Sequence, residues 1–207
     1  TLVGLILCPY LILRSESRSF DDLFRSPAKN SPLPYVITAV IVIVFIGVNS
    51  VFVEWNQKFT FPEFARAFEE WAREKETIAS EMTKFLTQFD SLAELALAIF
   101  VIAILPAVGE ENVFRGLIQN YFYKATHNHH VAIWMAAILF SAIHIQFFGF
   151  IPRLLLGALF GYLYYWSGNL WISVFAHFMN NAFSVILMYF YQRGAFDYDL
   201  EKPESLP

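Results

Sequence analysis

Long, uninterrupted apolar segments constrain the fold of this sequence more than any other feature. Residues 35–53 contain no charged side chain and are long enough to cross about 30 Å of hydrocarbon as a helix. Their valine and isoleucine content would suit a buried strand, but the segment is too long for one. With the further apolar segments, the sequence predicts an all-α, multi-pass transmembrane helical bundle of about six spans. The other segments are residues 1–13, 91–118, 131–146, 152–166 and 170–191.

The overall composition supports a membrane protein. Hydrophobic residues make up 57% of the chain and charged residues 15%, whereas soluble domains carry about 45–50% and about 25%. The net charge of −4 argues against nucleic acid as a partner, and the single cysteine, Cys8, excludes an intrachain disulfide. No small-residue cleavage site follows residues 1–13, so we interpret them as the end of a span rather than a signal peptide. We expect a single membrane domain over residues 1–207, in contact with membrane lipids.

Residues 60–89 differ from the spans because their apolar residues recur at alternating spacings of three and four. This pattern predicts a long amphipathic helix between the second and third spans. The sequence from Thr60 to Glu63 is typical of a capping box, with Thr60 as the N-cap. The apolar face indicates a helix in the membrane interface, and packing onto the end of the bundle is the alternative. The apolar positions are Phe61, Phe64, Phe68, Trp71, Ile78, Met82, Phe85 and Phe89.

Three charged residues, Glu110, Glu111 and Arg115, interrupt one of the apolar segments. An ionisable side chain at the centre of a bilayer costs about 2.5–3.5 kcal/mol, so such residues face the interior of a bundle and usually mark function. Glu111 and Arg115 are four residues apart and can pair on one face of a helix. Glu110 points about 100° away from that face. The arginine therefore holds one carboxylate and leaves the other free to react.

Two later segments repeat the spacing of four residues. Phe140 and His144 are the ends of "FSAIH", and His177 and Asn181 occupy the same spacing in "HFMNN". Each pair lies on one face of its helix. If the three faces converge, a single pocket holds a carboxylate, two imidazoles and an amide.

Such a pocket has the groups needed to hydrolyse a peptide bond without a covalent intermediate. A carboxylate and an imidazole can take a proton from water, and a second imidazole and an amide can donate hydrogen bonds to the resulting oxyanion. Three other interpretations remain open. Glu110, His144 and His177 match a catalytic zinc shell in number, although the HExxH spacing is absent. A proton or ion pathway also places such residues inside a bundle, and a buried polar network can simply specify helix packing.

Taken in order, three motifs resemble those of one protein family. Residues 110–115 match EExxxR, residues 140–144 match FxxxH, and residues 177–181 match HxxxN. Their order and separation resemble the CPBP family, which contains the CaaX proteases and bacteriocin-processing enzymes and is also called the Abi family. The flanking "GNLWISVFAHFMNN" is also similar to the family. The resemblance covers residues 91–191, which we take as the catalytic core.

The resemblance implies an intramembrane endopeptidase. It places Glu110 and His144 on the attacking water, and His177 and Asn181 at the oxyanion. Eukaryotic members remove a C-terminal tripeptide from prenylated proteins, and a non-proteolytic immunity or scaffold protein is the alternative function. No cofactor is predicted, with zinc as the alternative. The residues expected to support the site are Glu111, Arg115 and Phe140.

A site within the bilayer predicts a membrane-embedded or lipidated substrate, because a soluble peptide would need a route in. We expect the protein in a bacterial cell membrane, and no oligomeric state is predicted. Residues 127–130 ("HNHH") are interpreted as a solvated loop. Gly157 and Gly161 are interpreted as a helix-packing pair, and Arg153 as a contact with lipid headgroups or a side chain that snorkels to the interface.

Overall fold

The computed structural model describes Leu11, Arg14 and residues 31–195, and every regular element in residues 31–195 is a helix. The predicted N-terminal span, residues 1–13, lies almost entirely outside the described residues. The predicted all-α fold is confirmed for the described part of the chain. The longer helices are α3 (Leu33–Gln57), α4 (Arg66–Leu86), α8 (His129–Ala142), α9 (Phe150–Ser167) and α10 (Leu170–Gln192).

Within the described part of the chain, four helices are long and apolar enough to cross a membrane: Leu33–Gln57, Leu92–Thr126, Phe147–Ser167 and Leu170–Gln192. The predicted span at residues 131–146 is shorter than expected. Its helix, α8, has 14 residues, which is about 21 Å of helix and less than the hydrocarbon thickness. The chain leaves the helix after Ala142, and Ile145 adopts a left-handed backbone conformation with φ of 53°.

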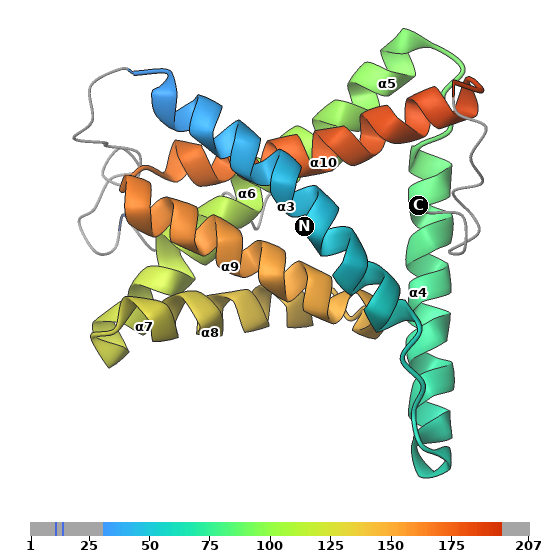
Figure 1. Cartoon of the computed structure of the whole chain (residues 1–207), viewed down its shortest axis with the longest axis horizontal. Coiled ribbons are helices and arrows are strands. Elements are labelled where there is room, and N and C mark those ends of the chain that lie inside the picture. The colour runs from blue at the N-terminus through green and yellow to red at the C-terminus, as the bar shows by residue number, and fades with distance from the viewer. Residues whose placement is uncertain (1–10, 12–13, 15–30, 196–207) are drawn as a thin grey trace.

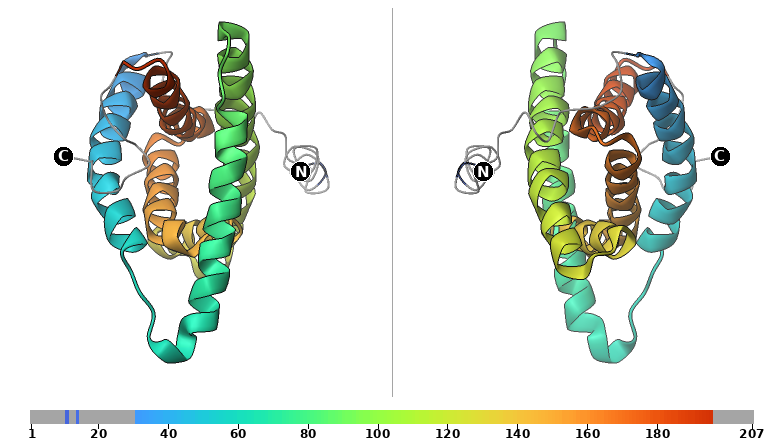
Figure 2. Two further views of the ribbon diagram at one scale, coloured as in Figure 1. Left: turned by 90° about the vertical axis from the view of Figure 1, so that its right-hand side faces the viewer. Right: turned by 90° about the vertical axis from the view of Figure 1, so that its left-hand side faces the viewer.

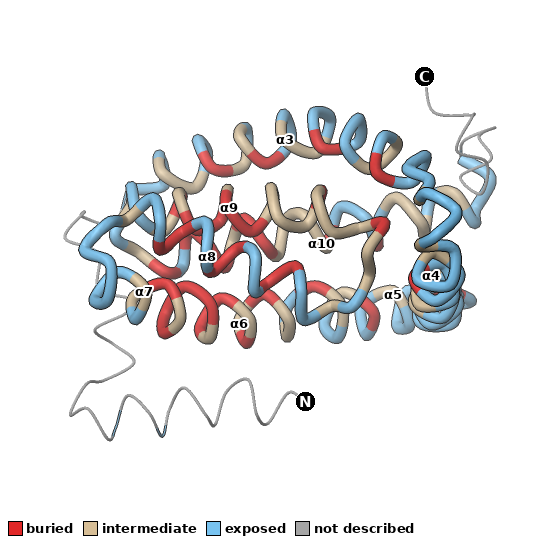
Figure 3. The backbone as a smooth tube through the Cα atoms, turned by 90° about the horizontal axis from the view of Figure 1, so that it is seen from below, coloured by how far each residue is buried: buried red, intermediate tan, exposed pale blue. Residues whose placement is uncertain are grey.

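The helices are arranged in layers (Figures 1 and 2). One layer is α3, the middle layer is α9 and α10, and the helix of residues 92–126 lies on the opposite side. The short helix α8 packs against α9 and α7 (Gln119–Thr126), as the view from below shows (Figure 3).

The helix of residues 92–126 is continuous but irregular. It contains two π-helical segments, Ile99–Ile104 and Asn112–Ile118, which alternate with α-helical turns. Pro106 lies between them and has no N–H to donate to the carbonyl of Ile102, four residues earlier. Proline and π-helical turns both bend a helix, so residues 110–115, the first of the three sequence motifs, lie on the distorted part of this element. The remaining segments are α5 (Leu92–Ala98), η2 (Ile99–Ile104), α6 (Leu105–Glu111) and η3 (Asn112–Ile118).

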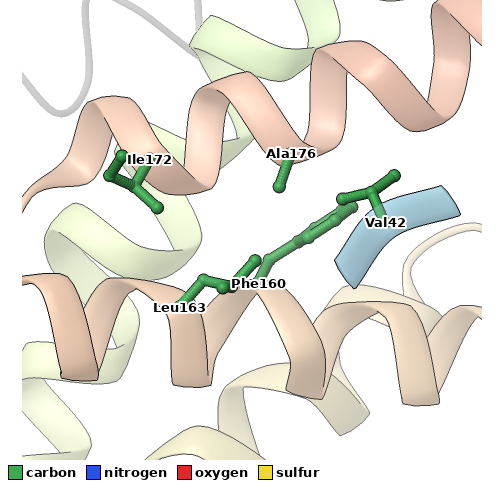
Figure 4. Packing of buried hydrophobic residues seen from close by; sticks show 5 residues of the cluster. All are labelled: Val42, Phe160, Leu163, Ile172 and Ala176. Atoms are coloured by element: carbon green, nitrogen blue, oxygen red, sulfur yellow. The ribbon is translucent and has the colours of Figure 1, made fainter. Parts of the chain in front are cut away.

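A buried cluster joins α3, α9 and α10. Phe160 is fully buried and lies at its centre, between side chains of the other two helices (Figure 4). Burial of an aliphatic or aromatic side chain stabilises a fold by about 1.5–3 kcal/mol relative to water. This cluster fixes α9 and α10 side by side, and both helices carry residues of the site. The members of the cluster are Val42, Phe160, Leu163, Ile172 and Ala176.

Gly157 and Gly161 allow α9 to approach α8 closely. A Cβ atom at Gly157 would lie 3.2 Å from the Cα atom of Ala137, and one at Gly161 would lie 2.9 Å from Cγ2 of Ile133. Real Cβ atoms essentially never approach another atom within 3.0 Å. The interpretation of these glycines as a packing pair is therefore confirmed.

The predicted loop at residues 127–130 is only partly a loop. His127 ends α7 with a left-handed φ of 52°, and Asn128 caps α8 through hydrogen bonds from the N–H groups of His130 and Val131. His129 and the following residues are already helical. The ring of His129 stacks on Tyr123 with a centroid distance of 3.8 Å.

The predicted amphipathic helix is present as α4, although it begins later than expected. Pro62 has an extended backbone, a 3-10 turn occupies Glu63–Ala65, and no side chain caps it, so the capping box at Thr60 is wrong. Glu69 accepts a hydrogen bond from the N–H of Phe61 instead, at 3.0 Å. That hydrogen bond and the adjacent Arg73 lower the pKa of Glu69.

Much of the apolar face of α4 is exposed. The helix contacts the rest of the bundle mainly at η4 (Phe147–Gly149), and it extends beyond the other helices in Figure 1. The ring of Phe147 lies 5.5 Å from that of Phe68 and 4.9 Å from that of Phe61. The membrane-interface position of α4 stays a prediction. The exposed apolar side chains are Phe64, Phe68, Trp71, Ile78, Met82, Phe85 and Leu86.

Candidate active site

The three sequence motifs converge on one cavity. It has a volume of about 450 Å³ and is lined by residues from α3, α4, α6, α8, η4, α9 and α10. Five of the seven residues singled out in the sequence line this cavity, and the other two, Glu111 and Arg115, are buried beside it. The five are Glu110, Phe140, His144, His177 and Asn181.

Glu111 is the centre of the buried charge network behind the cavity. It is fully buried, and its Oε1 atom lies 2.8 Å from Nη1 of Arg115. The same oxygen lies 2.8 Å from Nδ1 of His177, and the hydroxyl of Ser173 donates to Oε2. The predicted pairing of Glu111 with Arg115 is thus confirmed, and the carboxylate also holds a histidine from another helix.

Arg115 is 1% exposed and has partners on several elements. Its Nη2 donates to the carbonyl of Gly157 at 2.6 Å, which the close approach at that glycine makes possible. Its guanidinium carbon lies 5.0 Å from the ring centre of Phe140 and 5.5 Å from that of Phe160. A cation over an aromatic face is stabilised electrostatically. Phe140 therefore shields this ion pair and lines the cavity at the same time.

His177 is oriented by groups on both sides of its ring. Its ring stacks on Phe160, with centroids 5.0 Å apart and an interplanar angle of 19°. Because a carboxylate only accepts hydrogen bonds, Glu111 fixes a proton on Nδ1 of His177. The other nitrogen, Nε2, then faces the cavity and lies 3.9 Å from Oε2 of Glu110.

Glu110 extends into the cavity, with its side chain 17% exposed. The neighbouring Glu111 turns to the buried side, as the angular separation on a helix predicts. No described residue donates a hydrogen bond to the Glu110 carboxylate, and its charged neighbour Nε2 of His177 lies beyond hydrogen-bond distance at 3.9 Å. Glu110 is therefore the carboxylate with room to bind a water molecule or a substrate group.

His144 lies just after the end of α8 and faces the same cavity. Its Nδ1 lies 2.7 Å from the carbonyl oxygen of Phe140. A carbonyl only accepts, so Nδ1 carries the proton and Nε2 is left as an acceptor. The ring also packs edge-on against Phe140, with centroids 5.1 Å apart.

Asn181 lines the cavity but already has two partners. Its Nδ2 donates to the carbonyl of Ile102 at 3.1 Å, the group that Pro106 leaves without its helical donor. Its Oδ1 accepts a hydrogen bond from Nδ2 of Asn180 at 3.2 Å. An amide nitrogen has two N–H groups, so the second is available to a ligand while the first supports the distorted helix.

Several polar residues at the site were not singled out as site residues from the sequence. Ser173 lies four residues before His177 on α10, so its position in the sequence could have revealed it. Glu76 lies on α4, in a segment read only for its apolar pattern. The polar residues of the cavity that were not assigned to the site from the sequence are Asn49, Gln57, Glu76, Arg153 and Asn180. Arg153, interpreted from the sequence as a headgroup contact or a snorkelling side chain, lines the cavity and donates a hydrogen bond to Gln146.

The described residues contain no group of three His, Cys, Asp or Glu side chains placed to hold a metal ion. In particular, Glu110, His144 and His177 do not form such a group. The zinc alternative stays a prediction.

Part of the chain is similar to a known protein family. Residues 92–183 match the family model described as "Type II CAAX prenyl endopeptidase Rce1-like". The predicted resemblance to this family is confirmed over this segment. The segment contains all three motifs and coincides closely with the catalytic core expected from the sequence.

Two proteins of Bacillus subtilis (strain 168) are similar to the chain. "Uncharacterized protein YpbD" is 32% identical over 88 residues, which are 41% of this chain and 42% of that protein. "Putative membrane peptidase YdiL" is 30% identical over 98 residues, which are 47% of this chain and 40% of that protein. The matches therefore span well under half the length of either relative. No solved structure matches the chain.

Proposed function

We propose that this protein is an intramembrane endopeptidase that hydrolyses a peptide bond of a membrane-associated or lipidated protein. The observation that carries the proposal is the shared cavity: Glu110, His144, His177 and Asn181 come from three segments of the chain and line one space. The match to the Rce1-like family model and the similarity to "Putative membrane peptidase YdiL" support a membrane peptidase. The Bacillus relatives support a bacterial cell membrane as its location.

In the proposed reaction, Glu110 and the unprotonated Nε2 of His144 bind the attacking water. Glu110 takes a proton as the water oxygen bonds to the carbonyl carbon, which is general-base catalysis. The carbonyl electron pair moves onto oxygen and forms a tetrahedral oxyanion. When the oxyanion collapses, the C–N bond breaks as Glu110 returns its proton to the leaving nitrogen, and the products are a carboxylic acid and an amine.

The oxyanion is stabilised by His177 and the second N–H of Asn181. His177 donates from Nε2 when the ring is protonated, and the carboxylate of Glu111 on Nδ1 stabilises that imidazolium. Donors that are fixed in advance at the developing charge contribute about 2.7–4 kcal/mol each in hydrolases. Ser173 and Arg115 keep Glu111 in place for this role.

The test is cleavage of a panel of membrane-tethered peptides, with and without a prenyl group, by protein in liposomes. Glu110→Gln is expected to abolish cleavage while leaving thermal unfolding unchanged. Glu70→Gln is the matched control, because that carboxylate is 69% exposed on α4. Wild-type rates in Glu110→Gln would refute the role of Glu110. The metal content of the active preparation distinguishes the zinc alternative, which requires stoichiometric metal.

A further inference from the structure

A second polar cluster lies on the wall of the same cavity, on the side formed by α4 and the start of α9. Nη2 of Arg153 donates to Oε1 of Gln146 at 2.6 Å. Nε2 of Gln146 in turn donates to Glu76 at 3.3 Å, and the backbone N–H of Gly149 donates to the same carboxylate at 3.1 Å. Glu76 comes from α4, so this cluster links the amphipathic helix to the site.

The guanidinium of Arg153 is held in a fixed position beside Gly149. A Cβ atom at Gly149 would lie 3.2 Å from Nη2 and 3.4 Å from Nη1 of Arg153. The absence of a side chain at residue 149 thus makes room for the arginine fork. Gln146 is positioned by Glu76, so one side of the fork is occupied and its orientation is set.

The other side of the fork has no partner. Nη1 of Arg153 is buried and makes no hydrogen bond to any residue that the structure describes. Leaving a buried donor unsatisfied is unfavourable, and such a group calls for an explanation. Arg153 lines the cavity together with Glu110 and His144. An arginine with a free, preoriented N–H inside an otherwise largely apolar bundle is suited to binding an anion.

We propose that Arg153 is a specificity-determining residue that binds a carboxylate of the substrate through its guanidinium group. This inference rests on the proposed function, because it assigns the substrate class of that same site. The carboxylate belongs either to the C-terminus of the peptide or to an acidic side chain near the scissile bond. Both Arg153 and Glu110 line the cavity, and a substrate carboxylate is attracted by the arginine and repelled by the carboxylate of Glu110.

The test measures binding rather than cleavage. Protein carrying Glu110→Gln is placed in nanodiscs of uncharged phosphatidylcholine, so that bound peptide stays intact. Four lipid-tethered peptides of otherwise equal sequence are compared. The two peptides of the first pair differ at the C-terminus, which is a free carboxylate in one and an amide in the other. Both peptides of the second pair end in an amide, and one carries an internal aspartate where the other carries asparagine.

In one pair, the peptide with the carboxylate is expected to bind about tenfold to hundredfold more tightly than the peptide with the amide. This is the range for a charge-assisted hydrogen bond. The pair that shows the difference identifies the source of the carboxylate. Adding Arg153→Gln is expected to remove the preference, and Arg153→Lys to keep part of it. The control Arg66→Gln, with a side chain that is 75% exposed, is expected to keep it fully.

Equal binding of acid and amide in both pairs overturns the proposal, as does a preference that survives Arg153→Gln. Anionic lipid is then added to the nanodiscs. A peptide affinity that changes with this lipid, and not with the charge of the peptide, assigns Arg153 to a lipid headgroup and also overturns the proposal. Thermal unfolding of each variant shows whether the cavity is intact. If the wild-type protein cleaves no peptide but the preference for a carboxylate persists and depends on Arg153, the endopeptidase function is refuted and the carboxylate site is retained.

Discussion

Replacing Arg115 with methionine tests whether the buried ion pair holds the bundle together. Methionine keeps much of the length and apolar packing of the arginine stem but removes its charge and its donors. The change deletes the 2.8 Å contact with Glu111 and the 2.6 Å hydrogen bond to Gly157. Among the residues that the structure describes, the fully buried carboxylate of Glu111 then keeps hydrogen bonds to Ser173 and His177 and no cationic partner at Arg115.

Breaking one side of a buried pair costs about 3–5 kcal/mol, because the remaining charge is uncompensated. We therefore expect the free energy of unfolding of Arg115→Met to fall by about that amount. Exposed pairs contribute about 0–1 kcal/mol. The matched control is Arg66→Met, whose partner Glu70 is 69% exposed, and it should change the free energy of unfolding by less than about 1 kcal/mol.

The measurement is reversible unfolding of the purified protein in mixed micelles, followed by far-ultraviolet circular dichroism. The double variant Glu111→Leu, Arg115→Met removes both charges and should recover much of the loss, because apolar replacement of a buried pair is often neutral or stabilising. Equal stability of Arg115→Met and Arg66→Met would refute the reasoning. A double variant less stable than Arg115→Met would show that Glu111 contributes chiefly through Ser173 and His177.

Two further predictions concern packing and helix capping. Gly161→Ala places a Cβ atom 2.9 Å from Ile133 and should lower the free energy of unfolding by about 1–3 kcal/mol in the same assay. Gly47→Ala, with nothing within 4 Å of its Cβ position, should be neutral or stabilising, and equal losses would contradict the packing argument. Ser91→Ala removes one half of the capping box that Ser91 and Glu94 form, and should cost about 1 kcal/mol. Faster amide hydrogen exchange confined to the start of α5 would accompany that loss, and an unchanged exchange rate there would argue against the cap.

The spans could be predicted because their signal is local. The apolar run at residues 35–53 and the turn before Leu170 are visible without knowledge of the fold. The short length of α8 was not visible, because the residues after Ala142 are still apolar. There the chain turns to place His144 and the 3-10 turn at residues 147–149 against the cavity. Only the tertiary structure shows that this segment stops being helical.

The failed capping box at Thr60 has a similar cause. The four-residue pattern is correct, but Phe61 packs against Phe147 at 4.9 Å between ring centres, and Pro62 keeps the chain extended. Contacts with a segment far along the chain outweighed a local preference of about 1 kcal/mol. The capping box that does form joins Ser91 and Glu94 at the start of α5.

The site was predictable within each helix and not between helices. The spacing of Glu111 and Arg115 indicated their ion pair, because both lie on one helical face. The hydrogen bond from His177 to Glu111 joins residues 66 positions apart, and no periodicity encodes that register. The contribution of Glu76 depends on where α4 lies against η4, which the amphipathic pattern alone does not specify.

The hydrogen bond from Asn181 to Ile102 has a consequence for how substitutions in this protein are tolerated. Pro106 removes a backbone donor and Asn181 replaces it, so a substitution at either position changes which donors can reach the carbonyl of Ile102. A variant at residue 181 alters a helix bend as well as the polar lining of the cavity. In a mutational scan, an inactive variant at residue 181 has lost both the support of the helix bend and a polar group of the cavity. A second substitution at residue 106, which restores the backbone N–H, separates these two losses.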